Sequence, residues 1–277
     1  MTEGRDILYE IHDKVAIITL NLPQVYNSLN NDQYLLLGKL VERANDNNST
    51  LFTLIQSTGK YFSSGANVKD ISLDFNVDVN NDLEETKYWL NNFTSRNAYL
   101  THIFYSHKKI LVGALNGPCI GLTTGLVALM DIIYSINDED VFLLAPFANL
   151  GLVTEGGIGY TLLSRLGLSY ANEALLLSKP IHVKRLLQIG FINKNFQFKS
   201  NQVDQFNKSV LKELLNSSIN LESESILDIK EIIKSNYLKD LESINSKEII
   251  IGLKKWLKHL PQERFKKIAS KNLKHKL

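Results

Sequence analysis

The sequence predicts an α/β fold with a layer of helices at its C-terminal end. Through about residue 165, short apolar runs of strand length alternate with stretches of helical periodicity, and this rhythm recurs about four times. From about Leu168 the strand-like runs stop, and apolar residues recur at helical spacing to the end of the chain. Alternating strands and helices are typical of α/β folds. We expect a core over residues 1–200 and a helical region over 201–277 that completes the fold and supplies oligomer contacts.

The elements of the first half follow from apolar spacing. A helix with the apolar stripe Tyr34, Leu37, Val41 and Ala44 is expected to begin at Asn30 or Asn31, since either side chain can cap it. Three strands, a mobile loop and a long helix complete this half: strands 8–11, 15–20 and 51–55, the loop Asp70–Asp82 and the helix Glu84–Ser106.

The second half is predicted in the same way. Strands are expected over 110–115, 132–135 and 141–144, and helices over 121–130 and 157–166. In the C-terminal region one apolar stripe consists of Val203, Phe206, Val210, Leu211, Leu214 and Leu215. Asn245 with Glu248 three residues later resembles a capping box before a helix over 249–253.

Composition excludes several classes of protein. Of the 277 residues 44% are hydrophobic, and the mean hydropathy of −0.09 predicts a soluble protein with a substantial core. A net charge of +2 gives no support for nucleic-acid binding. The single cysteine, Cys119, excludes an intrachain disulfide and is interpreted as a small core residue. We expect no membrane span, because the nearly uncharged run Cys119–Ile136 contains Asp131 and two glycines.

Glu155 is the most informative single residue. It is the only charged side chain between Asp140 and Arg165, and apolar residues and glycines surround it. Apolar surroundings disfavour the charged form of a carboxyl and raise its pKa, which suits a group that takes and returns protons near neutral pH. The alternative is that Glu155 only caps the helix that follows.

Two further segments offer exposed backbone N–H groups. One is the loop 59–67, with small residues from Ser63 to Ala66, and the other is the turn 116–122, which leads into a helix. Two converging N–H groups stabilise an oxyanion, and a buried carboxyl moves a proton, so together they suit enolate chemistry. Each glycine loop alone is weak support, because loops after strands are usually only turns.

Taken together, four segments resemble the crotonase (enoyl-CoA hydratase/isomerase) superfamily. They are Phe62-Ser63-Ser64-Gly65-Ala66-Asn67, Leu115 to Leu122 (LNGPCIGL), Ala128 to Ser135 (ALMDIIYS) and Pro146 to Gly151 (PFANLG). Their order and spacing match over about residues 8–200, and the resemblance is greatest to fungal peroxisomal Δ3,Δ2-enoyl-CoA isomerases, where it extends to the C-terminus. The resemblance implies a crotonase-like spiral of ββα turns and assembly as a homotrimer or homohexamer.

The resemblance also implies roles for individual residues. Glu155 is the implied catalytic residue, and the N–H groups of Ala66 and Leu122 form the implied oxyanion hole. The implied substrate-binding residues are Ser64, Gly65, Ala66, Asn67, Val68, Leu122, Asn97 and Phe147. The usual acid of the first loop is replaced by Asn67, and the usual triple glycine is reduced to Gly121-Leu122-Thr123, but neither change removes a backbone N–H.

The resemblance further separates two activities. Hydratases of this superfamily carry two glutamates, whose positions here hold Gly125 and Phe147, whereas isomerases of this branch keep one acid, at the position of Glu155. The implied function is a Δ3,Δ2-enoyl-CoA isomerase of fatty-acid β-oxidation that acts on acyl-CoA by a single-glutamate proton shuttle, without metal or cofactor. The alternatives are a dienoyl-CoA isomerase and a non-catalytic acyl-CoA-binding subunit.

The remaining candidates carry competing interpretations. Asn97 either positions Glu155 through a hydrogen bond or is an ordinary helix amide. His102 and His107 are expected to be surface or partly buried residues without a catalytic role, and no nucleophile elbow surrounds Ser63 and Ser64.

The C-terminal tail is the last candidate. Its cations from Arg264 to Lys276 form either a solvated helix face or a contact for the phosphates of CoA. The terminal His275-Lys276-Leu277 resembles a peroxisomal import signal, so we expect an import receptor as a partner and the peroxisomal matrix as the location. The acidic, mixed N-terminus lacks the pattern of a secretory signal.

Overall fold

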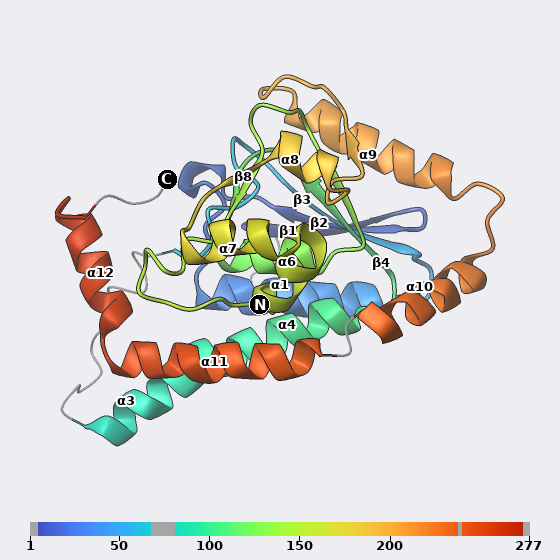
Figure 1. Cartoon of the computed structure of the whole chain (residues 1–277). Helices are drawn as coiled ribbons and strands as arrows, with labels where there is room; N and C mark the ends of the chain where they lie inside the picture. The colour runs from blue at the N-terminus through green and yellow to red at the C-terminus, as the bar shows by residue number, and fades with distance from the viewer. Residues whose placement is uncertain (1–4, 68–80, 238–239, 274–277) are drawn as a thin grey trace.

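Two sheets form the centre of the computed structural model, which describes residues 5–67, 81–237 and 240–273 (Figure 1). The larger sheet has the strand order β1-β2-β3-β4-β6-β9, in which only the β1–β2 pair is antiparallel. Its strands are β1 (Ile7–His12), β2 (Val15–Leu20), β3 (Phe52–Ser57), β4 (Ile110–Leu115), β6 (Ile132–Ser135) and β9 (Lys194–Asn195). The smaller sheet has the order β5-β7-β8, with strands β5 (Cys119–Ile120), β7 (Phe142–Leu144) and β8 (Ile181–His182).

The predicted strands and helices of the first half are present. The β1–β2 hairpin turns at Asp13, whose φ of 49° lies in the left-handed region that Asp tolerates well. Helix α1 (Asn31–Asn45) begins after Asn30, so Asn30 rather than Asn31 is the cap. Its side chain accepts the Gln33 N–H while the Gln33 side chain accepts the Asn30 N–H.

The helix predicted over 84–106 is interrupted by a π-helical segment. Helix α3 (Asp82–Trp89) passes through π-helical residues Leu90–Ser95 into α4 (Arg96–Ser106). A π turn is wider than an α turn, so it rotates the residues after it relative to a continuous α-helix. Nothing in the apolar pattern of the sequence marks this change.

The C-terminal region contains strands that the sequence prediction missed. After Leu168, β8 and β9 add to the two sheets, so the expectation that strands stop there is wrong. Each has two residues, too few to show the alternation by which a strand is recognised in a sequence. The intervening helices are α5 (Leu122–Ala128), α6 (Ile158–Leu166), α7 (Leu168–Leu176) and α8 (Val183–Gln188). The last helices are α9 (Val203–Ser217), α10 (Ser223–Tyr237), α11 (Leu241–Leu257) and α12 (Leu260–Ala269).

The capping box predicted at Asn245 and Glu248 is absent. Helix α11 begins at Leu241, so both residues lie inside the helix, and both are buried. The two residue types match a local cap, but Glu248 accepts the Gly157 and Gly159 N–H groups instead, and Asn245 Oδ1 has no hydrogen-bond partner among the described residues. Helix α11 runs alongside α4 (Figure 1), which brings Glu248 to the start of α6.

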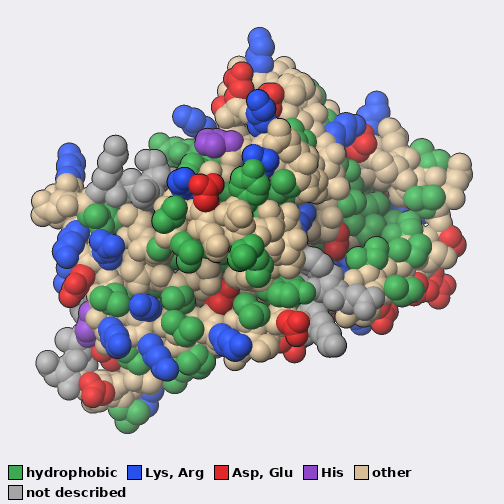
Figure 2. Space-filling view, in the orientation of Figure 1, with side chains coloured by type: hydrophobic (Ala, Val, Ile, Leu, Met, Phe, Trp, Pro, Cys, Tyr) green, Lys and Arg blue, Asp and Glu red, His purple; other side chains and the backbone are tan. Residues whose placement is uncertain are grey.

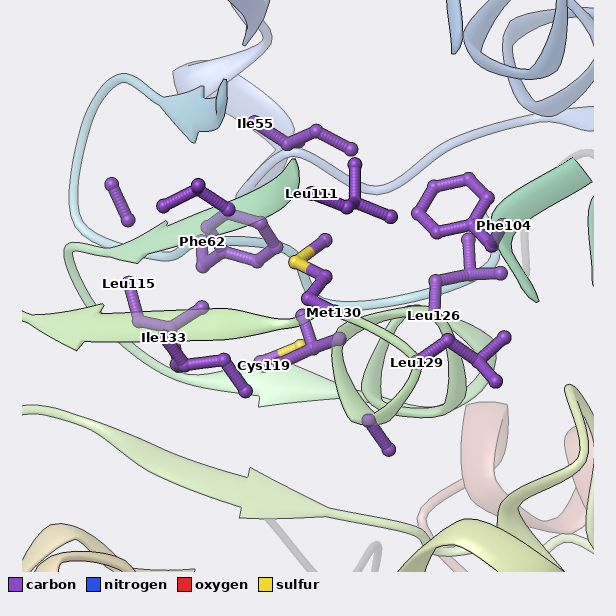
Figure 3. Packing of buried hydrophobic residues seen from close by; sticks show 14 of the residues in the cluster. Ile55, Phe62, Phe104, Leu111, Leu115, Cys119, Leu126, Leu129, Met130 and Ile133 are labelled. Atoms are coloured by element: carbon purple, nitrogen blue, oxygen red, sulfur yellow. The ribbon is translucent and has the colours of Figure 1, made fainter. Parts of the chain in front are cut away.

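One apolar core joins the two predicted regions. Side chains from β3, β4, β6, α4 and α5 interdigitate in it with Phe62 of the first loop, Cys119 of β5 and Met130, which follows α5 (Figure 3). Val203, Phe206, Val210 and Leu214 of α9 and Leu241 of α11 belong to the same cluster. The division at residue 200 stays a prediction. Across the described residues, no helix has the length and apolar character needed to cross a membrane.

Candidate active site

A cavity of about 340 Å³ lies where the first loop, the start of α5 and the Glu155 turn meet. Seven of the predicted site residues line it: Ser64, Gly65, Ala66, Asn67, Leu122, Phe147 and Glu155. Leu150 and Leu152, together with Trp256 of α11 and Phe265 of α12, give the cavity an apolar wall. Two larger hollows, of about 430 and 720 Å³, lie against α10 and contain no predicted site residue.

Ala66 directs its N–H away from the neighbouring strand-like segment. The Leu29 N–H donates to Gly65 O at 2.9 Å, and the Asn67 N–H donates to Leu29 O at 2.9 Å. In a parallel bridge of this kind the residue between the two bonded ones points its own N–H to the other side. Among the described residues the Ala66 N–H has no acceptor, and Ala66 lines the cavity.

Leu122 is the first residue of α5, so its N–H has no partner within the helix. The Gly121 N–H donates to Leu144 O at 2.9 Å, which leaves Leu122 to face the cavity. Gly121 has φ 67° and ψ −136°, a conformation that is open essentially to glycine. No acceptor for the Leu122 N–H is found in the part of the chain that the structure describes.

The two loops touch backbone to backbone. The Ile120 N–H donates to Ser63 O at 3.0 Å, and a Cβ on Gly65 would lie 2.7 Å from Ile120 O. Buried hydroxyls brace this contact: Ser63 Oγ accepts the Gly65 N–H at 3.1 Å and lies 3.1 Å from Thr123 Oγ1. The two unpartnered N–H groups therefore belong to segments that are fixed to each other.

The Glu155 turn packs against α5 through glycine. Gly156 and Gly157 both have φ 72°, which a residue with a side chain adopts only with strain. A Cβ on Gly125 would lie 2.8 Å from Glu155 O and 3.3 Å from Gly156 Cα. A glutamate at position 125 would therefore displace the turn that carries Glu155.

The capping alternative for Glu155 is wrong, because α6 begins after Gly157 and Glu155 makes no capping bond to it.

Burial sets the charge state of Glu155. Its exposed fraction is 7%, and burial raises the pKa of its carboxyl to about 7. The Arg96 guanidinium and a hydrogen bond from Asn97 Nδ2 to Oε2, at 3.2 Å, oppose this increase. Asn97 therefore does bond to Glu155, but it does not line the cavity, where the sequence analysis expected it to bind substrate.

Arg96 is a site residue that the sequence analysis missed. Its guanidinium donates from Nε and Nη2 to Asn97 Oδ1 at 3.1 and 3.0 Å, stacks over the Tyr34 ring and lines the cavity. Arg96 orients the Asn97 amide, because the oxygen faces the guanidinium and the nitrogen faces Glu155. One signal was available: Arg96 is the only Lys, Arg, Asp or Glu between Lys87 and Lys108.

The other candidates lie away from the cavity. His102 is exposed, as expected. His107 is 2% exposed and bonds to Thr53, so the expectation of a surface or partly buried residue is wrong for it. Burial together with nearby lysines lowers the pKa of His107 to about 3. Cys119 is buried in the core, and burial raises the pKa of its thiol to about 12.

Three predictions cannot be compared with the structure: the substrate-binding role of Val68, the mobile loop 70–82 and the import signal 275–277. Val68, most of the loop 70–82 and the terminal 275–277 lie outside the described residues. Arg264, Lys266 and Lys267 lie on α12, and basic side chains gather over α11 and α12 (Figure 2). In the described ranges no group of three or more His, Cys, Asp or Glu side chains is placed to hold a metal ion.

Known proteins are similar to this chain in sequence and in fold. Residues 10–248 match the family described as Enoyl-CoA hydratase/isomerase. A 3,2-trans-enoyl-CoA isomerase of Saccharomyces cerevisiae is 42% identical over 99% of this chain and 98% of its own, and a Delta(3,5)-Delta(2,4)-dienoyl-CoA isomerase of the same yeast is 38% identical over 98% of each. The crystal structure of an enoyl-CoA hydratase/isomerase from Pseudoalteromonas atlantica T6c matches with a TM-score of 0.80 at 19% identity, over 96% of this chain and 98% of its own.

The chain therefore belongs to the enoyl-CoA hydratase/isomerase family and has the crotonase fold that the sequence predicted. Together with its yeast relatives, this membership identifies it as an isomerase enzyme.

Proposed function

We propose that the protein is a Δ3,Δ2-enoyl-CoA isomerase that converts 3-enoyl-CoA to trans-2-enoyl-CoA in fatty-acid β-oxidation. The observation that carries the proposal is a buried carboxyl with a pKa of about 7, placed in a cavity with two unpartnered backbone N–H groups. The 42% identity to the yeast 3,2-trans-enoyl-CoA isomerase supports it.

In this mechanism the thioester oxygen binds between the N–H groups of Ala66 and Leu122. Glu155 removes a proton from C2, and the electron pair of that C–H bond enters the acyl system to give a dienolate. Each N–H group contributes about 3–4 kcal/mol to stabilising the negative oxygen, as similar donors do in other enzymes. The donors need no rearrangement during the reaction, because their loops are fixed to each other.

The same carboxyl then completes the reaction. Protonated Glu155 returns a proton to C4, and the double bond forms between C2 and C3. A pKa near 7 lets one group act as base and then as acid at neutral pH, which contributes about 10²–10⁴-fold to the rate. Asn97 holds Oε2, so Oε1 is the oxygen free to move between the two carbons.

Hydration would need a second acid to activate water. Among the described residues that line the cavity, Glu155 is the only Asp or Glu. The hydratase position at 125 has no room for a side chain, and the position at 147 is an apolar Phe. The arrangement therefore favours proton transfer within the acyl chain over addition of water.

A second candidate is a dienoyl-CoA isomerase, which the 38% identity to the yeast dienoyl-CoA isomerase favours. That reaction moves two double bonds and requires proton transfer over a longer distance. A second acid opposite Glu155 would serve it, and none lines the described cavity. A purely binding subunit is less favoured, because a carboxyl in a cavity with a pKa raised to about 7 is typical of a catalytic acid or base.

The discriminating experiment uses three substrates with the purified protein: 3-hexenoyl-CoA, 2-hexenoyl-CoA and a 3,5-dienoyl-CoA. We expect conjugation of the first, no hydration of the second and slower turnover of the third. Faster turnover of the dienoyl substrate would replace the first candidate with the second. Hydration of 2-hexenoyl-CoA would contradict both, and binding without any turnover would support the non-catalytic subunit.

The setting of the enzyme is part of the proposal. We place it in the peroxisomal matrix, delivered by an import receptor that binds His275-Lys276-Leu277, and assembled as a homotrimer or homohexamer. A relative from mouse, 26% identical over 96% of this chain and 77% of its own, is named enoyl-CoA delta isomerase 3, peroxisomal. The chemistry uses only the carboxyl and the two N–H groups, so the mechanism includes no cofactor and no metal.

A further inference from the structure

Glu248 of α11 holds the backbone that carries Glu155. Its Oε2 accepts the Gly157 N–H and its Oε1 accepts the Gly159 N–H, both at 2.8 Å. The Thr154 side chain adds a third hydrogen bond. Glu248 is 5% exposed, and the three residues that it contacts lie on both sides of Glu155 in the sequence.

No local cap replaces this contact. Gly157 precedes α6 with φ 72°, and no side chain of the turn itself caps the helix. The N–H groups at a helix start lack partners within the helix, and a carboxylate at that position is stabilised by them. Glu248 therefore satisfies two N–H groups of the Glu155 turn from a helix nearly 90 residues later in the chain.

We propose that Glu248 is a positioning residue for the reaction: its carboxylate fixes the 154–159 turn so that Glu155 faces the two oxyanion donors. This inference rests on the proposed function, since it assigns the geometry of the same site. It gives the C-terminal region a part in the chemistry, because α11 supplies both Glu248 and the cavity wall residue Trp256.

Glu248 also acts on Glu155 through its charge. Among the described residues, the charged groups that act on Glu155 are Arg96 from α4 and Glu248 from α11, and the Tyr34 phenol of α1 lies next to Arg96. The negative charge of Glu248 raises the pKa of Glu155, and Arg96 lowers it. Removal of the Glu248 charge should therefore lower the pKa of Glu155.

Two variants separate position from charge. Glu248→Gln keeps the shape of the side chain, removes the charge and leaves one of the two N–H groups without an acceptor. Gly159→Ala keeps both charges but places a Cβ 2.9 Å from Glu248 Oε1, so the carboxylate must move. Glu242→Gln is the matched control, because Glu242 lies on α11 as well and its side chain is 71% exposed.

The measurement is the pH profile of kcat and kcat/KM with 3-hexenoyl-CoA. For Glu248→Gln we expect a several-fold lower kcat and an acidic limb that moves to lower pH. For Gly159→Ala we expect a lower kcat with the limb unmoved, and for Glu242→Gln we expect the wild-type profile. Circular dichroism and the melting temperature establish that each variant is folded.

Wild-type kcat and limb in a folded Glu248→Gln variant would overturn the inference. Should Glu248→Gln fail to fold, wild-type kcat in Gly159→Ala would overturn it and a lowered kcat would support it. Should the wild-type protein itself not isomerise the substrate, the proposed function fails. The role of Glu248 is then tested by measuring the pKa of the Glu155 carboxyl through ¹³C NMR titration. An unchanged Glu155 pKa in Glu248→Gln would then refute the role of Glu248.

Discussion

Arg96 offers the sharpest test of how the site controls the charge of Glu155. Replacing it in Arg96→Met removes the guanidinium that lowers the pKa of Glu155. Loss of a nearby opposite charge raises the pKa of a carboxyl by about one unit or more. The pKa of Glu155 should therefore rise from about 7 to roughly 8 or above.

The kinetic consequence follows from the ionised fraction. With a pKa of about 7, about half of the Glu155 carboxyls are ionised at pH 7. With a pKa of about 8, only about a tenth are, so kcat/KM at pH 7 should fall about five-fold from this cause alone. Because the base must be ionised in the free enzyme, the loss should be recovered as the pH rises toward 9.

The assay is the pH profile of kcat/KM for 3-hexenoyl-CoA between pH 5 and 9. Arg96→Lys serves as the control, since it keeps a positive charge but loses the paired hydrogen bonds to Asn97. We expect the acidic limb to move up in Arg96→Met and to move less in Arg96→Lys. An acidic limb that stays in place or moves to lower pH in Arg96→Met would refute this account of the electrostatics.

Two further predictions concern the oxyanion loops. Gly65→Ala should lower kcat strongly, because Gly65 has φ 86° and its new Cβ would lie 2.7 Å from Ile120 O; wild-type kcat in a folded variant would contradict the proposed geometry. Thr123→Val should lower the free energy of unfolding by about 1–3 kcal/mol, because the buried Tyr34 hydroxyl loses Thr123 Oγ1 as its partner. Urea denaturation measures this change, and Thr123→Ser, which keeps the hydroxyl, should retain most of the stability. An unchanged midpoint in Thr123→Val would show that the contacts of the Thr123 hydroxyl with Tyr34 and Ser63 do not stabilise the fold.

The sequence predicted most of the fold because apolar spacing is a local property. Helix α1, the strands β2 to β4 and the strand β6 lie close to their predicted bounds, since each is long enough to show its period. The two-residue strands β8 and β9 exist only through their pairing with β7 and β6. The π-helical segment before Arg96 spans only Leu90–Ser95, too few residues to change the apolar spacing of the sequence visibly.

Some site residues could likewise be predicted from the sequence, whereas others become recognisable only in the folded structure. Glu155 and the glycine loops stand out in the sequence, because a lone acid and clustered glycines are unusual in apolar surroundings. The Glu248 contact could not be predicted, since it joins residues 89 and 91 positions apart. Asn245 and Glu248 resembled a local cap because Asn and Glu are typical of capping boxes, although here both residues lie inside α11.

Glu155→Gln is the substitution that tests the central claim most directly. The variant keeps the volume of the side chain and the bond from Asn97 but removes the base. We expect kcat for 3-hexenoyl-CoA to fall by about 10²–10⁴-fold, while the affinity for a non-reactive acyl-CoA measured by calorimetry stays within about three-fold. A kcat within ten-fold of the wild-type value in the folded variant would contradict the single-glutamate proton shuttle.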